Sequence, residues 1–302
     1  MVDCPSAVPK QTGGRALGQE IAIGAGLFVL GSLLGSFLNV VIWRLPRDES
    51  IVAPRSRCPA CGALIRWYDN IPIVSFIFLR RKCRACKAPI SWRYPLVEFL
   101  AGLVLLLLYL RFGLGEYLFV YGPFALALLA ITFIDIDHRI IPNEISLPGI
   151  LVGFGCSFLW PGFWKESLLG ILLGGGLLFL LSWGYSLIRG REGMGMGDVK
   201  LLAMMGAFLG WRSLLFIALF ASVQGVLAAL AMWLSGVELQ PPLPEEDEEE
   251  SPPPPEPEAQ GPPEKVGFFG AAIPFGPFLA LAALEYLFFG AAFFAWLSGG
   301  RV

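Results

Sequence analysis

Two aspartates carry the clearest chemical signal in this sequence, because each lies where an apolar stretch meets a polar one. Asp198 ends the glycine-rich part of "GMGMGDVKLL" (193–202), and Asp135 lies in "ITFIDIDHRIIPNEI". Ionisable groups at membrane depth are costly and therefore indicate functional sites. Two converging carboxylates cannot both ionise, so one can take a proton from water while the other donates to a carbonyl oxygen. Such a pair could hydrolyse a peptide bond without a metal ion.

The spacing of the acids decides which of them could pair. On a regular helix two residues two positions apart point about 200° away from each other, so Asp135 and Asp137 cannot share one site. Asp135 therefore needs a partner from elsewhere, and Asp198 is the candidate. The glycines before Asp198 would let the backbone approach an extended substrate. Asp198 as an ordinary helix N-cap remains an equal alternative from this stretch alone.

Four of the six cysteines form two CxxC pairs, "CPAC" and "CRAC", with 21 residues between them. Each pair can direct two thiolates at one tetrahedral metal, which predicts a structural zinc site. The alternative is a pair of redox disulfides, which needs an oxidising compartment or an exchange partner. The expected zinc ligands are Cys58, Cys61, Cys83 and Cys86.

Membrane-spanning helices must position these residues. Of the 302 residues 56% are hydrophobic and 15% charged, whereas soluble domains have about 25% charged residues. Long apolar runs predict an all-α polytopic membrane protein. About eight transmembrane helices are expected, at 20–43, 96–111, 118–135, 145–163, 167–188, 199–211, 213–235 and 267–296. The sixth is too short to cross a core about 30 Å thick unless it tilts or ends partway.

The distribution of charge predicts the orientation of the chain. Residues 44–93 hold eleven of the 22 lysines and arginines, opposed by only three acids. The positive-inside rule places this segment in the cytoplasm and the N-terminus outside. With eight spans, the loops at 136–144 and 189–198 fall on the same side, so Asp135 and Asp198 would meet at the cytoplasmic face.

The expected organisation separates a membrane core from a small metal-binding domain. Between residues 237 and 265 the chain holds ten prolines and ten acids against one lysine, which is typical of a disordered linker. We expect membrane lipid as a partner and no nucleic acid, and no oligomeric state is predicted. The domains are an N-terminal tail (1–18), a first transmembrane helix (19–43), a cytoplasmic four-cysteine zinc-binding domain (44–94), a transmembrane peptidase core (95–236), the acidic linker (237–265) and a last transmembrane helix (266–302).

Three other side chains near the apolar segments have simpler interpretations. Glu98 opens the second span and is expected to pair with Arg93, or else to bind a substrate or cosubstrate. His138 is expected at the surface, and Lys200 is expected to point away from Asp198 because it lies two helical positions on.

The order and spacing of several motifs resemble those of the prepilin peptidases. These are bifunctional type IV leader peptidases and N-methyltransferases of the GxGD aspartic protease class. The motifs are the two CxxC pairs, "GSFLNVVIWRLPR" (35–47), "NIPIVSF" (70–76), "RYPLVE" (93–98), "DIDHRIIPN" (135–143), "GMGDVKLLAMMGAFLG" (195–210) and "IPFGPFLA" (273–280).

The resemblance implies specific chemistry. Asp135 and Asp198 would form the catalytic dyad, and the substrates would be type IV prepilins or type II secretion pseudopilins. Cleavage would follow the leader glycine on the cytoplasmic side of the bacterial inner membrane. S-adenosylmethionine would then methylate the new N-terminus, an activity associated with the zinc-binding region. Asn143 stands where the family often has aspartate.

Three alternatives make different predictions. A peptidase without methyl transfer would leave the new N-terminus unmodified. A membrane thiol oxidoreductase would use the four cysteines and tolerate Asp135→Asn. A non-catalytic assembly scaffold would still support pilus assembly after both aspartates were replaced by asparagine.

Overall fold

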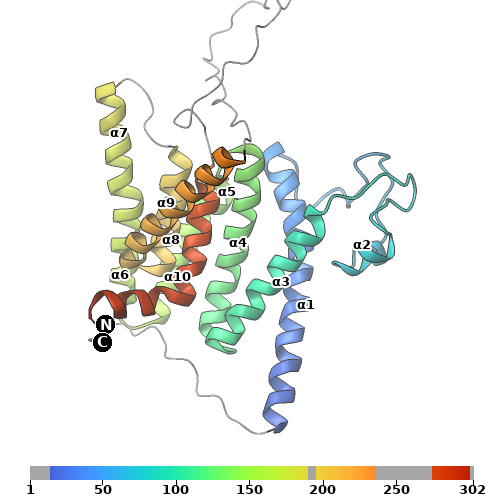
Figure 1. The fold of residues 1–302 in the computed structure, drawn as a ribbon, viewed down its shortest axis with the longest axis horizontal. Helices are drawn as coiled ribbons and strands as arrows, with labels where there is room; N and C mark the ends of the chain where they lie inside the picture. The colour runs from blue at the N-terminus through green and yellow to red at the C-terminus, as the bar shows by residue number, and fades with distance from the viewer. Residues whose placement is uncertain (1–13, 190–194, 236–273, 300–302) are drawn as a thin grey trace, which may run out of the picture.

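The computed structural model describes residues 14–189, 195–235 and 274–299, so the predicted linker and most of the N-terminal tail lie outside it. The described residues form an assembly of helices (Figure 1), as the composition predicted, and contain β-bridges but no named strand. The helices are α1 (Gly14–Arg44), α2 (Val74–Phe78), α3 (Arg93–Phe112), α4 (Glu116–His138), α5 (Asn143–Cys156), α6 (Phe163–Ile171), α7 (Leu178–Arg189), α8 (Met196–Leu209), α9 (Trp211–Leu234) and α10 (Gly276–Leu297). Short 3₁₀ turns lie at Leu45–Arg47, Trp67–Asn70 and Ser157–Leu159, and a π-helical segment spans Leu172–Leu177.

Each of the eight predicted apolar segments corresponds to helix, but their lengths differ from a regular set of spans. Within the described residues, six helical stretches are long and apolar enough to cross a membrane. The helices α5 and α8 have 14 residues each, which gives about 21 Å of length. That is less than a hydrocarbon core of about 30 Å. The structure therefore supports a multi-pass membrane protein without confirming eight complete spans.

Small residues allow α1 and α3 to pack closely. A Cβ atom added at Gly31 would lie 2.6 Å from the carbonyl oxygen of Ala101, and one at Gly35 would lie 2.7 Å from Cα of Glu98. Glycine at such positions lets helix backbones approach in a membrane, where packing rather than water drives association. The two glycines of the "GSLLG" segment at 31–35 thus let α1 pack directly against the backbone of α3.

A second close approach fixes the position of α8. The backbones of Gly170 in α6 and Gly206 in α8 touch, so a Cβ atom at either position would collide with the other residue's carbonyl group. Beside this contact, the Ser167 hydroxyl of α6 donates a 2.7 Å hydrogen bond to the carbonyl of Ala207, the residue after Gly206 in α8. The two contacts hold α8, which carries Asp198, against the π-interrupted α6–α7 unit.

Replacing Gly206 with alanine should lower the free energy of unfolding by at least about 1–3 kcal/mol, which is the usual cost of overpacking. The opposing atoms belong to backbone and cannot move aside as a flexible side chain would. Thermal unfolding in detergent should show a lower Tm for Gly206→Ala. Gly155→Ala is the matched control, since nothing lies within 4 Å of a Cβ atom there. An equal Tm for the two variants would contradict the close approach.

The main apolar core joins α4, α8 and α10. Leu128 and Ile131 of α4, Leu201 and Met205 of α8, and Leu279 of α10 are fully buried in one cluster. Asp135 lies near the C-terminal end of α4, and α8 and α10 begin close to it. Packing these three helices together therefore brings their ends to one region of the molecule.

Candidate active site and metal centre

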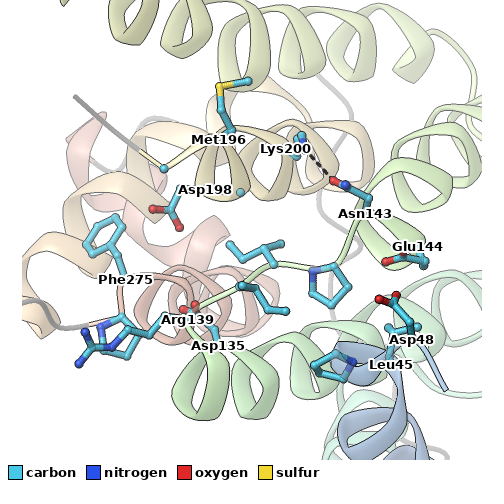
Figure 2. Close-up of a pocket in the computed structure, with 17 residues that line it drawn as sticks. Leu45, Asp48, Asp135, Arg139, Asn143, Glu144, Met196, Asp198, Lys200 and Phe275 are labelled. Atoms are coloured by element: carbon cyan, nitrogen blue, oxygen red, sulfur yellow. Dashed lines mark hydrogen bonds between the residues drawn. The ribbon is translucent and has the colours of Figure 1, made fainter. Parts of the chain in front are cut away.

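A cavity of about 670 Å³ lies where five helices begin or end. Its lining comes from the residues after α1, the end of α4, the loop into α5, the start of α8 and the residues leading into α10. Figure 2 shows Asp135 and Asp198 on opposite sides of this space, with both carboxylates turned into it. The structure thus brings together the two aspartates that the sequence predicted as partners.

Asp135 is deeply buried, with 5% of its surface exposed. Its Oδ2 atom accepts no hydrogen bond from the described residues. The backbone N–H of Gly276 attracts its carboxyl group, and the negative charge of Asp198 repels it when both are ionised. Helix α4 ends three residues later, at His138, because Arg139 adopts a left-handed conformation and donates its N–H to the Asp135 carbonyl at 2.9 Å. A buried polar atom without a partner is uncommon and costly. This oxygen is enclosed, with less than 1 Å² of its surface accessible, so it faces the protein and not the cavity.

Gly276 abuts the carboxylate of Asp135 from the start of α10. A Cβ atom at Gly276 would lie 2.5 Å from Oδ2 of Asp135. No sequence argument predicted this contact, although the "PFGP" motif at 274–277 marked the position. The last helix therefore completes the wall of the cavity.

Replacing Gly276 with alanine should displace the Asp135 carboxylate and lower peptidase turnover by about 10–100-fold, since misplacement of about 1 Å can cost about 10²-fold. The loss should appear in kcat more than in KM. Gly225→Ala is the control, because a Cβ atom there meets only ring carbons at 3.8 Å or more. Full turnover by Gly276→Ala would contradict the proposed orientation of Asp135.

Asp198 lies in the first turn of α8, and Gly195 is the N-cap residue of that helix. The interpretation of Asp198 as the N-cap is therefore wrong, although an acid in the first turn still favours the helix dipole. A Cβ atom at Gly197 would lie 3.0 Å from Cβ of Ile141. Because Gly197 has no side chain, the loop after α4 can pack against the start of α8. This packing brings the two aspartates to one cavity.

The neighbouring charged residues have partners outside the dyad. Asp137 forms an ion pair with Arg93 of α3, which agrees with the prediction that it points away from the Asp135 site. The expected pairing of Arg93 with Glu98 is wrong: Glu98 accepts a 2.7 Å hydrogen bond from the backbone N–H of Ile73. Lys200 points away from Asp198 and donates to Asn143 Oδ1 at 2.7 Å.

The four predicted zinc ligands form one cluster. Their Sγ atoms all lie within 4.8 Å of one another, and the Sγ atoms of Cys58 and Cys86 are 3.9 Å apart. Four sulfurs at about 2.3 Å from a tetrahedral zinc would be about 3.8 Å apart, so the donor set fits this ion. All four are free thiols.

The two CxxC turns have the same backbone design. Cys58 donates its N–H to Ala63 and accepts from Gly62, and Cys83 does the same with Ala88 and Lys87. Gly62 and Lys87 both adopt positive φ. Each turn closes with an isolated β-bridge, Arg57 with Leu64 and Lys82 with Pro89.

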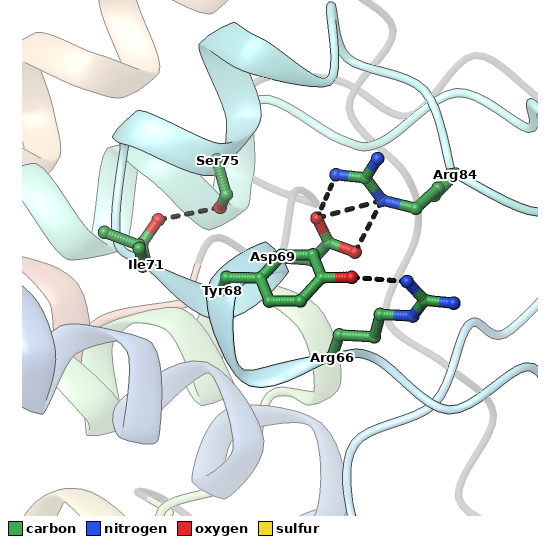
Figure 3. A network of polar contacts seen from close by, with 6 residues as sticks. All are labelled: Arg66, Tyr68, Asp69, Ile71, Ser75 and Arg84. Carbon is green, nitrogen blue, oxygen red and sulfur yellow. Dashed lines mark hydrogen bonds and ion pairs between the residues drawn. The ribbon is translucent and has the colours of Figure 1, made fainter.

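Hydrogen-bond donors and an ion pair support the cluster. The backbone N–H groups of Cys86 and Ala85 lower the pKa of the Cys83 thiol to about 6, whereas the hydrogen bond with Cys86 raises the pKa of the Cys61 thiol to about 11. The close thiols thus share their protons, which a metal bound by all four would displace. Figure 3 shows Arg84, between Cys83 and Cys86, donating to both oxygens of Asp69 at 2.6–3.2 Å. These hydrogen bonds hold the pKa of Asp69 below its usual range. They tie the second cysteine turn to the 3₁₀ turn at Trp67–Asn70.

A bundle of membrane helices with two carboxylates in one cavity defines a polytopic membrane protein with the groups that an aspartic peptidase uses. The chain belongs to the type IV leader peptidase family, whose model matches residues 123–230. Residues 29–112 match the model of the bacterial peptidase A24 N-terminal domain.

Similar proteins carry one name. The prepilin leader peptidase/N-methyltransferase of Myxococcus xanthus (strain DK1622) is 39% identical over 308 aligned residues, which cover 90% of each chain. The proteins of the same name from Burkholderia pseudomallei (strain 1026b) and Stutzerimonas stutzeri are 35% and 36% identical, with 90% and 87% of this chain covered and 87% and 89% of theirs. No solved structure matches the chain.

Proposed function

We propose that this protein removes the leader peptide of type IV prepilins or type II secretion pseudopilins and then methylates the new N-terminus. The observation that carries the peptidase half is the convergence of Asp135 and Asp198 on one cavity. The relatives' shared name supports both halves. It gives no support to a thiol oxidoreductase or a scaffold, nor to a peptidase that lacks methyl transfer.

The two aspartates would act as a general acid and a general base. Asp135 and Asp198 are close enough to interact electrostatically, and like charges in a low-dielectric site favour one shared proton. The ionised carboxylate draws a proton from a water, which attacks the peptide carbon. The protonated carboxyl group donates to the carbonyl oxygen as the tetrahedral intermediate forms. Both residues line the cavity, so either carboxyl group could take either role.

The cavity is proposed to open to the cytoplasm of a bacterial inner-membrane protein. Its lining residues after α1, after α4 and at the start of α8 come from or adjoin segments that the charge distribution assigns to the inside. A substrate could present its leader junction at this end, with cleavage after the leader glycine, while its apolar helix rests in lipid against the spans.

The four-cysteine cluster is proposed to hold structural zinc. Cys58, Cys61, Cys83 and Cys86 would supply four thiolates, which leaves no open position for a reacting water. The ion would supply folding energy to a segment with few buried apolar residues. S-adenosylmethionine is the methyl donor that we infer from the names of the relatives.

Mass spectrometry of a purified prepilin tests both activities in one reaction. Incubation with the detergent-solubilised protein and S-adenosylmethionine should give a product that has lost its leader and gained one methyl group at the new N-terminus. Omission of S-adenosylmethionine should leave cleavage intact and remove only the methyl group. An uncut substrate would refute the peptidase, and a cut but unmethylated product would refute the transferase.

A further inference from the structure

The four-cysteine domain exposes an apolar surface that its own fold does not use. In α2, Ile77 and Phe78 are 66% and 82% exposed, and Val74 lies one turn before them and is exposed as well. Phe76, on the opposite side of the helix, is buried and packs against Trp92 with ring centroids 4.9 Å apart. One face of α2 thus holds the domain together, and the other presents large apolar groups outward.

A hydrogen bond fixes the level of this surface relative to the membrane helices. The Glu98 carboxylate, only 8% exposed, accepts the N–H of Ile73, the residue just before α2. Glu98 lies five residues into α3, about 7.5 Å along the helix axis from Arg93. The start of α2 is therefore held beside the first turns of a spanning helix and not beyond its end. Figure 1 shows α2 outside the bundle, on the side of α1.

Basic residues follow the apolar surface directly. Arg80, Arg81 and Lys82 come two to four residues after Phe78, and all three are exposed. The Arg81 guanidinium lies over the Trp92 ring at 4.8 Å, so its position is tied to the same aromatic residue that buries Phe76. Large apolar groups beside clustered cations, at the edge of the hydrocarbon region, match the chemistry of an anionic lipid surface.

We propose that Val74, Ile77 and Phe78 of α2, together with Arg80, Arg81 and Lys82, form a lipid-docking patch for the anionic headgroups of the cytoplasmic leaflet. The apolar side chains insert among the headgroups, and the cations bind lipid phosphates. The Ile73–Glu98 hydrogen bond ties the patch to α3, which is long and apolar enough to cross a membrane. Docking would hold the four-cysteine domain flat against the membrane and limit its motion about the Ile73–Glu98 contact.

Hydrogen–deuterium exchange of the zinc-loaded full chain in nanodiscs tests this proposal. Amides of residues 74–82 should exchange more slowly in discs that contain phosphatidylglycerol than in discs of phosphatidylcholine alone. The double variant Arg80→Gln/Lys82→Gln should lose this difference. Each basic residue near an anionic surface strengthens membrane binding by about fivefold. The variant Ile77→Ser/Phe78→Ser should exchange faster in both kinds of disc, with zinc content unchanged.

The matched control is Arg55→Gln/Arg66→Gln, which removes the same charge from exposed positions outside the two cysteine turns. It should keep the slow exchange in phosphatidylglycerol. Equal exchange in the two kinds of disc, or an equal loss in the control, would overturn the assignment to anionic lipid. Slow exchange that appears only after a prepilin is added would assign the surface to a peptide instead.

Discussion

Asp135→Asn and Asp198→Asn should each reduce cleavage of a prepilin by about 10²–10⁴-fold or more, the range for loss of general acid–base catalysis. Asparagine keeps the shape of the side chain but can neither take a proton from water nor pass one to a carbonyl oxygen. Both carboxylates line the same cavity. Loss of either one therefore removes either the general base or the general acid. Initial rates of leader removal in detergent measure the effect, and KM should change little.

Asp137→Asn provides a closely matched control for these variants. It makes the same chemical change two residues from Asp135, on a partly exposed side chain that pairs with Arg93 and does not line the cavity. Cleavage by this variant should stay within a few-fold of the unaltered protein. Near-normal turnover by either dyad variant, or a comparable loss in Asp137→Asn, would end the assignment of the dyad.

Removal of zinc should unfold the four-cysteine domain while the membrane helices stay intact. Structural zinc sites contribute roughly 10–16 kcal/mol in small peptides, far more than the few buried side chains of this segment can supply. Cys58→Ser, or chelation of the ion, should make the arginine-rich segment between 55 and 87 rapidly cleavable by trypsin. Elemental analysis should find one zinc ion per chain before the change and none after it.

Cys156→Ser is the control for the cysteine variants, because Cys156 lies in α5, away from the cluster. Its zinc content and its resistance to trypsin should match those of the unaltered protein. A zinc-free preparation that resists trypsin as well as the loaded one would refute the structural role of the metal.

The sequence contained enough to pair the aspartates before any coordinates. Helical geometry excluded Asp137 as the partner of Asp135, and the charge pattern put Asp198 on the same side. Both inferences depend on local periodicity and on the positive-inside rule, which act over short stretches of chain. The CxxC spacing likewise predicted a cluster that the structure shows as four thiols within 4.8 Å.

What the sequence could not provide depends on contacts between distant segments. The approach of Gly276 to Asp135 results from packing α10 against α4, and no periodicity encodes it. Glu98 was assigned the wrong partner because Arg93 is near in sequence, whereas in space Arg93 reaches Asp137 and Glu98 meets the backbone of Ile73. The lengths of α5 and α8 also depend on how their neighbours pack, so hydropathy alone does not establish how many segments cross the membrane completely.

The contribution of α10 to the aspartate cavity has a consequence for biogenesis. Asp135 and Asp198 are synthesised well before Gly276, so a nascent chain at the translocon already carries both acids without the backbone that abuts the first of them. The proposed hydrolytic centre is complete only when α10 has been inserted and has packed against α4. Newly made molecules should therefore stay inactive until α10 is in place.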